Sequence, residues 1–214
     1  MTRKIRTLAL ALFALAATSA FASSTASAVN FTAASYPVTL TAGQETGSPV
    51  TLTLDGYSTL CHTADFQGSL EKSSEEVTLY QGFYECTFGT AATPLKVNVA
   101  MNGCTHKLNL TSVSTADFSL VCPPGQEMKL GVAENLCVVE IPPFQKLAHV
   151  KFSNNHPNIR GEFEVTGITA TLTDPGKIFC PFTGNTTVTD GKYTGSFVMG
   201  GENGKGEAVT IDLG

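Results

Sequence analysis

Cysteine is the residue type in this chain whose chemistry depends most on spacing, because a thiol can form a disulfide, bind a metal ion or act as a nucleophile. No C-x-x-C pair occurs, and the intervals of 15 to 43 residues between neighbouring cysteines are too wide for paired zinc ligands. Cys61 and His62 are adjacent, but a catalytic thiol and its imidazole are normally distant in sequence. An even number of cysteines instead predicts disulfides. The six lie at Cys61, Cys86, Cys104, Cys122, Cys137 and Cys180.

Strand register narrows the choice among the many pairings that six cysteines allow. If two strands pair about the polar segment 71–76, residues whose numbers sum to 147 face each other. This register places Leu70 opposite Val77 and Cys61 opposite Cys86. An apolar pair and a cysteine pair therefore agree on one hairpin.

The same arithmetic gives a second hairpin, in which the numbers of facing residues sum to 226. It places Leu108 opposite Phe118 and Cys104 opposite Cys122. Two cysteines then remain for the last bridge. We therefore predict the disulfides Cys61–Cys86, Cys104–Cys122 and Cys137–Cys180.

Known catalytic and metal-binding motifs are missing from the sequence. The four histidines are scattered and do not form the H-E-x-x-H pattern of a zinc hydrolase. The nearest match to the G-x-S-x-G nucleophile motif, residues 56–60, lacks the second glycine. Acidic residues gather in the segment 71–76, which we interpret as a solvent-exposed turn. The sequence therefore predicts no catalytic, cofactor or metal site, unless residues distant in the chain converge in space.

Aromatic residues are concentrated at one place, the segment 79–85, which contains Tyr80, Phe83 and Tyr84. These side chains either pack in the core beside the Cys61–Cys86 bridge or form a recognition surface. Tryptophan is absent, which argues against a conventional sugar-binding face. We retain Tyr80, Phe83 and Tyr84 as a candidate recognition surface.

The first 28 residues have the pattern of a secretory signal peptide. A basic cluster precedes an apolar run over residues 8–17, and two A-x-A sites follow at 20–22 and 26–28. We favour cleavage after Ala28, with Ala22 as the alternative. The run is too short to span a bilayer, which needs about 20 residues. Cleavage after Ala28 leaves residues 29–214 with a net charge of 10 − 18 = −8. We therefore expect a secreted mature protein with no membrane span, and its acidic charge argues against a nucleic-acid partner.

The elements that must position these residues are strands. Apolar and polar residues alternate along much of the mature chain, and turn signals recur every eight to twelve residues. This pattern predicts an all-β antiparallel sandwich or barrel with little or no helix. We expect one two-layer structure over residues 29–214, or two small β-lobes with a boundary near 123–135. The clearest alternating segments are 38–41, 97–101, 107–111, 162–166 and 168–173.

Three further segments, 102–105, 121–125 and 137–143, follow one another in this order behind the signal peptide. Their sequences are N-G-C-T, V-C-P-P-G and C-V-V-E-I-P-P. In this respect the chain resembles a group of uncharacterised secreted, disulfide-containing β-rich proteins of high-GC Gram-positive bacteria. The resemblance implies export and disulfides, and it implies no activity and no functional residue.

Export, a disulfide framework and the lack of a catalytic motif favour a non-enzymatic extracellular or cell-envelope module. We expect it to bind a partner or to serve a structural role, without a cofactor. One alternative is a secreted hydrolase of unfamiliar type, which would need a pocket that holds at least two titratable groups with shifted pKa values. Another is a secreted protease inhibitor, which a rigid disulfide framework with exposed loops would suit.

Overall fold

The computed structural model describes residues 29–89, 94–143, 146–173 and 186–214, so the predicted signal peptide lies outside the described residues. Within these ranges the chain forms strands and turns and no helix. The strands in chain order are β1 (Phe31–Ala33), β2 (Val38–Gln44), β3 (Val50–Leu54), β4 (Tyr57–Leu70), β5 (Glu76–Phe88), β6 (Leu95–Ala100), β7 (Thr105–Ser112), β8 (Thr115–Val121), β9 (Met128–Val132), β10 (Cys137–Ile141), β11 (Lys146–Asn155), β12 (Asn158–Thr173), β13 (Thr186–Asn203), β14 (Ala208–Val209) and β15 (Ile211–Leu213).

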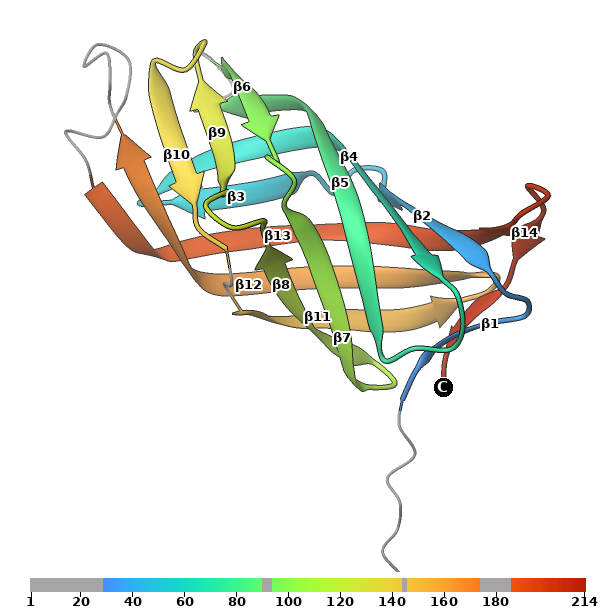
Figure 1. Ribbon diagram of the computed structural model, residues 1–214. Helices are drawn as coiled ribbons and strands as arrows, with labels where there is room; N and C mark the ends of the chain where they lie inside the picture. The colour runs from blue at the N-terminus through green and yellow to red at the C-terminus, as the bar shows by residue number, and fades with distance from the viewer. Residues whose placement is uncertain (1–28, 90–93, 144–145, 174–185) are drawn as a thin grey trace, which may run out of the picture.

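One large sheet contains every described strand except β1 and β15, which pair with each other, and this sheet closes on itself (Figure 1). One circuit of hydrogen-bonded neighbours runs β4–β5–β7–β8–β11–β12–β13–β2 and returns to β4. A second circuit runs β4–β5–β6–β9–β10–β12–β13–β3 and returns to β4. The long strands β4, β5, β12 and β13 belong to both circuits. Closure gives these strands neighbours on both sides along much of their length and so limits unpaired sheet edges; residues 80–85 of β5 pair with β4 only, among the described strands.

The core lies between two layers formed by opposite sides of the closed sheet. Figure 1 shows β4, β5 and β7 crossing in front of β11, β12 and β13. Aromatic side chains from both layers meet between them, with ring centroids 4.2–6.4 Å apart. They are His106, Phe118, Phe163, Tyr193 and Phe197.

The predicted fold class is therefore confirmed: the described chain is all-β, antiparallel and sandwich-like. The sequence allowed a sandwich or a barrel and did not decide whether the two layers close into one sheet, as they do here. Alternation shows which side chains share a face of a strand, but it does not show which strands are neighbours.

Both predicted hairpin registers are confirmed. The pairs of β4 and β5 sum to 147 from Thr59–Phe88 to Gln67–Tyr80, and Cys61 and Cys86 form a disulfide. The pairs of β7 and β8 sum to 226 along most of their length, and Cys104 and Cys122 form a second disulfide. Cys137 is also disulfide-bonded. Cys180, its predicted partner, lies outside the described residues.

The segment 123–135, marked as a candidate lobe boundary, contains β9. This strand pairs with β6 on one side and β10 on the other, within the same closed sheet. Among the described residues, no helix is long and apolar enough to cross a membrane.

Candidate recognition face on the outer side of the sheet

The three aromatic residues of the segment 79–85 do not share one face of β5. Tyr80 and Tyr84 point outward, with 66% and 55% of their surface exposed. Phe83 is partly buried and packs edge-to-face against Phe66, with ring centroids 6.3 Å apart. Successive side chains of a strand point to opposite faces, so an odd-numbered residue here faces the core and its even-numbered neighbours face solvent.

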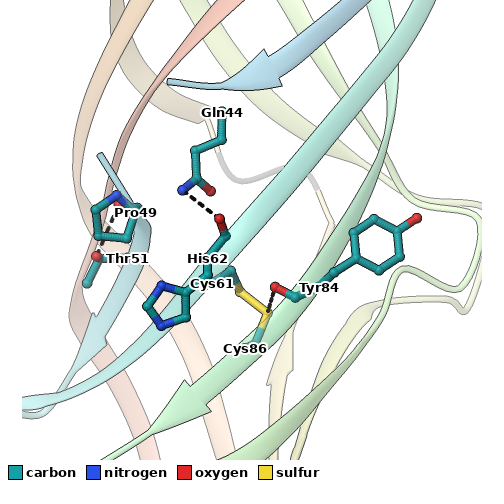
Figure 2. The surroundings of a disulfide bond; sticks show 7 residues. All are labelled: Gln44, Pro49, Thr51, Cys61, His62, Tyr84 and Cys86. Atoms are coloured by element: carbon teal, nitrogen blue, oxygen red, sulfur yellow. Dashed lines mark hydrogen bonds between the residues drawn. A yellow bond between two sulfur atoms is a disulfide. The ribbon is translucent and has the colours of Figure 1, made fainter. Parts of the chain in front are cut away.

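An irregularity at Glu85 separates Tyr84 from the disulfide beneath it. Glu85 has a φ of 52°, in the left-handed region, and both Tyr84 and Glu85 are exposed. Cys86 then turns inward to meet Cys61. In Figure 2 the Tyr84 ring points away from the disulfide, while its carbonyl oxygen lies 3.7 Å from Sγ of Cys86. The covalent cross-link thus anchors the strand that presents the ring.

The Tyr84 ring extends back along the strand over Gly82. A Cβ atom at residue 82 would lie 2.8 Å from Cζ of Tyr84, so any other residue would displace the ring. On the adjacent strand, Asp65 faces Gly82 and Gln67 faces Tyr80. Both side chains are exposed, so they border the two tyrosines.

A shallow groove of about 430 Å³ adjoins the tyrosines across β4, β2, β13 and the start of β12. Its floor is low because Gly43 and Gly200 occupy positions on this face. No atom lies within 4 Å of the position that a Cβ of Gly43 would take. The groove lining is Thr41, Ala42, Gly43, Asp65, Phe66, Gln67, Asn158, Val198 and Gly200.

Polar side chains around this groove have no partner among the residues that the structure describes. Within the described ranges, the side chains of Thr41, Asp65, Gln67 and Asn158 make no hydrogen bond or ion pair. Their donors and acceptors therefore remain available to a ligand. We call this surface the tyrosine face, and it comprises Tyr80, Tyr84, Thr41, Asp65, Gln67 and Asn158.

The neighbouring outer surface of β12 and β13 differs, because its charges satisfy one another. Arg160 donates from Nη2 to Oε2 of Glu45 at 2.8 Å and also pairs with Glu162. Ser196 donates from Oγ to the same Glu45 oxygen at 2.8 Å. Hydrogen bonds from Arg160 and then Ser196 lower the pKa of Glu45. We call Glu45, Arg160, Glu162 and Ser196 the ion-pair patch. Its hydrogen bonds and ion pairs to one another account for its charged side chains without a ligand.

The interior holds a third feature, a cavity of about 40 Å³ lined by His106 and Tyr193 among apolar side chains. Burial lowers the pKa of His106 to about 3 and raises the pKa of Tyr193. Neither Nδ1 of His106 nor the Tyr193 hydroxyl has a hydrogen-bond partner in the described part of the protein. The imidazole is therefore neutral near pH 7 and sealed between the layers, out of reach of a large substrate.

The other sequence candidates lie apart from these features. Cys61 is disulfide-bonded, so it offers no thiolate to His62, which is exposed on the outer side (Figure 2). The carboxylates of the segment 71–76 are exposed at the β4–β5 turn, as predicted, and Glu76 pairs with Lys107 at 2.6 Å. Among the described residues, no group of three His, Cys, Asp or Glu side chains is placed to hold a metal ion.

Sequence reasoning missed most of the tyrosine face and the whole cavity. The register sum of 147 already places Asp65 opposite Gly82 and Gln67 opposite Tyr80. Asp65 and Gln67 could therefore have been predicted as neighbours of the tyrosines. His106 lies on the same face of β7 as the buried Leu108, and this alternation was also visible. No sequence signal connected Asn158 to β4.

No family model, no curated protein and no solved structure matches this chain. The tyrosine face, the ion-pair patch and the interior cavity are therefore the features from which a function can be argued. Of these three, the tyrosine face alone combines exposed aromatic rings with polar side chains that have no partner in the described ranges.

Proposed function

We propose that this protein is a secreted, non-enzymatic binding module that recognises an extracellular or cell-envelope partner through the tyrosine face. The observation that carries the proposal is the exposure of Tyr80 and Tyr84 beside unpartnered polar side chains. Tyrosine combines a large apolar ring with a polar hydroxyl, and it is enriched at recognition surfaces. Two exposed rings on one strand face therefore favour binding over a purely structural role.

Rigidity supports the same proposal. A tyrosine side chain has few rotatable bonds, so fixing it on binding costs little entropy. The Cys61–Cys86 disulfide holds β4 and β5 together directly beside Tyr84. A preorganised surface retains more of its contact energy as affinity than a flexible loop does.

Export is supported by the pattern of residues 1–28 and by disulfides, which persist in oxidising compartments. The resemblance to secreted β-rich proteins of high-GC Gram-positive bacteria points the same way. A net charge of −8 on residues 29–214 disfavours nucleic acid as the partner.

A hydrolase would need titratable groups with shifted pKa values in an accessible pocket. The acidic groups with a resolved shift, Glu45 and Glu164, are bound to Arg160 and Lys192. His106 and Tyr193 are shifted by burial and lie in the interior. These observations favour binding over hydrolysis.

The test compares the secreted protein with a Tyr80→Ala/Tyr84→Ala double variant in sedimentation with isolated cell envelopes. We expect wild type to sediment and the double variant to remain in solution. Tyr57→Ala is the matched control, because Tyr57 is also an exposed tyrosine but lies at the start of β4, eight residues from Asp65 and away from the groove. Equal sedimentation of wild type and the double variant would refute the proposal. N-terminal sequencing, with Val29 as the expected first residue, tests export separately.

A further inference from the structure

Resting on the proposed function, we propose that the ligand of the tyrosine face is an uncharged polysaccharide chain that lies across β5, β4, β2 and β13. The argument uses the two rings, the unpartnered polar side chains, the glycine floor of the groove and the pairing of the strands beneath it.

The two rings supply apolar contact. A sugar ring has a face of C–H groups that packs against an aromatic ring, while its hydroxyl groups point sideways. Tyr84 lies over Gly82 with more than half of its surface exposed, so its ring is a platform at the level of the sheet. Tyr80 lies four residues away on the same face, about 13 Å along the strand. A ligand that contacts both must be longer than one sugar ring. Tryptophan is absent, but tyrosine offers a similar apolar face.

The polar side chains supply hydrogen bonds of the kind that hydroxyl groups need. Carboxylate and amide groups are planar and can bond two neighbouring hydroxyls at once. Asp65 and Gln67 stand directly opposite Gly82 and Tyr80, within reach of a sugar that stacks on the rings. Asn158 borders the far end of the groove, where its Oδ1 would lie 2.9 Å from a Cβ at Gly200.

The glycines supply room. Gly200, Thr41 and Gln67 face one another in one cross-strand row, and Val198, Gly43 and Asp65 do so in the next. Glycine in these rows leaves a trough that runs across the strands to Asp65 and Gln67, which lie opposite Gly82 and Tyr80 on β5. Because the Cβ position at Gly43 is open, a methyl group there would occupy ligand space without a protein atom within 4 Å.

Strand pairing and charge argue against other polymers. Along the groove, β2 is hydrogen-bonded to β13 and β4, and β13 also pairs with β12. An extended peptide therefore cannot add to β2 or β13 along the groove through its backbone, which is how peptides commonly bind at exposed sheet edges. On β5, residues 80–85 pair with β4 on one side and with no other described strand on the other, so hexalysine serves below as the peptide probe for this edge. Asp65 within the groove and the net charge of −8 disfavour anionic polymers.

The experiment is calorimetric titration of the mature protein with six-residue probes. The neutral probes are cellohexaose, xylohexaose, mannohexaose, maltohexaose and hexa-N-acetylchitohexaose; hexagalacturonate is the anionic probe and hexalysine the cationic one. We expect at least one neutral probe to bind and both charged probes to bind at least tenfold more weakly. Tyr84→Ala and Tyr80→Ala should each weaken that binding about tenfold.

Gly43 gives the sharpest variants. Gly43→Ala should weaken binding partly and Gly43→Leu should abolish it, with the urea midpoint of unfolding little changed in either. Thr39→Val is the matched control, because Thr39 is exposed on the same strand but outside the groove lining, and binding should stay within about twofold of wild type.

Absence of binding by all five neutral probes, or undiminished binding by Gly43→Leu, overturns the glycan assignment. If hexalysine alone binds, or if the tyrosine variants still lose envelope sedimentation, the proposed function stands with a different ligand.

Discussion

The inner and outer sides of the closed sheet hold the same residue types in opposite situations. Tyr193 and His106 face inward, where a polar atom of each is buried without a partner in the described ranges. Tyr84 and His62 face outward from β5 and β4, where both side chains are exposed to solvent. The inner pair therefore costs stability, whereas the outer tyrosine leaves contact energy free for a ligand. Substitutions on the two sides should affect different measurements.

The largest effect should come from acid acting on His106. Its pKa is about 3 in the folded protein and about 6.5 when exposed. As the pH falls below about 6.5, the unfolded state binds a proton that the folded state does not, so stability declines until about pH 3. The total loss is on the order of 5 kcal/mol. Urea unfolding at pH 7, 5 and 4 should show a flatter pH dependence for His106→Phe than for wild type. The exposed control His62→Phe should behave like wild type, and the same slope in all three proteins would contradict this account.

The disulfides should come next. Removal of the Cys61–Cys86 bridge, with both residues changed to Ala, should lower the free energy of unfolding by about 3 kcal/mol, because the bridge closes a loop of 25 residues. The Cys104–Cys122 pair, with a separation of 18, should cost a similar amount. Only the first pair lies beside Tyr84, so only its removal should also weaken binding to the tyrosine face. Equal weakening by both double variants would show that binding follows overall stability.

A smaller effect of opposite sign is expected at Tyr193. Tyr193→Phe removes a buried hydroxyl that has no partner in the described ranges, so it should stabilise the protein by about 1 kcal/mol in urea unfolding. Tyr84→Phe, on the outer side, should change stability by less than about 0.5 kcal/mol. A loss of stability in Tyr193→Phe would indicate that the hydroxyl is hydrogen-bonded inside the cavity.

The smallest change in stability, but a clear change in binding, is expected for Tyr84→Ala. Its ring is mostly exposed, so the free energy of unfolding should shift by less than about 0.5 kcal/mol. Phe83→Ala provides the contrast, because Phe83 packs against the core and its loss should cost roughly 1–3 kcal/mol. If Tyr84→Ala destabilised the protein as much as Phe83→Ala, the division between the two sides would be wrong.

The sequence alone determined local pairing and orientation. The sums of 147 and 226 predicted two strand registers and two disulfides, because a hairpin with a fixed turn has one register that keeps apolar side chains on one face. The same alternation separates Tyr80 and Tyr84 from Phe83, although the three were predicted together as one candidate surface. The lack of helix was equally predictable from the period of the apolar residues.

Only the tertiary structure decided which distant segments became neighbours. Three features depend on contacts between strands that are far apart in the chain. They are the circuits through β4–β5 and β10–β12, the groove in which Asn158 and Gly200 meet Thr41, and the cavity at His106 and Tyr193. Local patterns carry no information on such contacts, because alternation is the same whichever strand lies alongside. The left-handed conformation of Glu85 is likewise required by the inward turn of Cys86, and no glycine or asparagine marked it in the sequence.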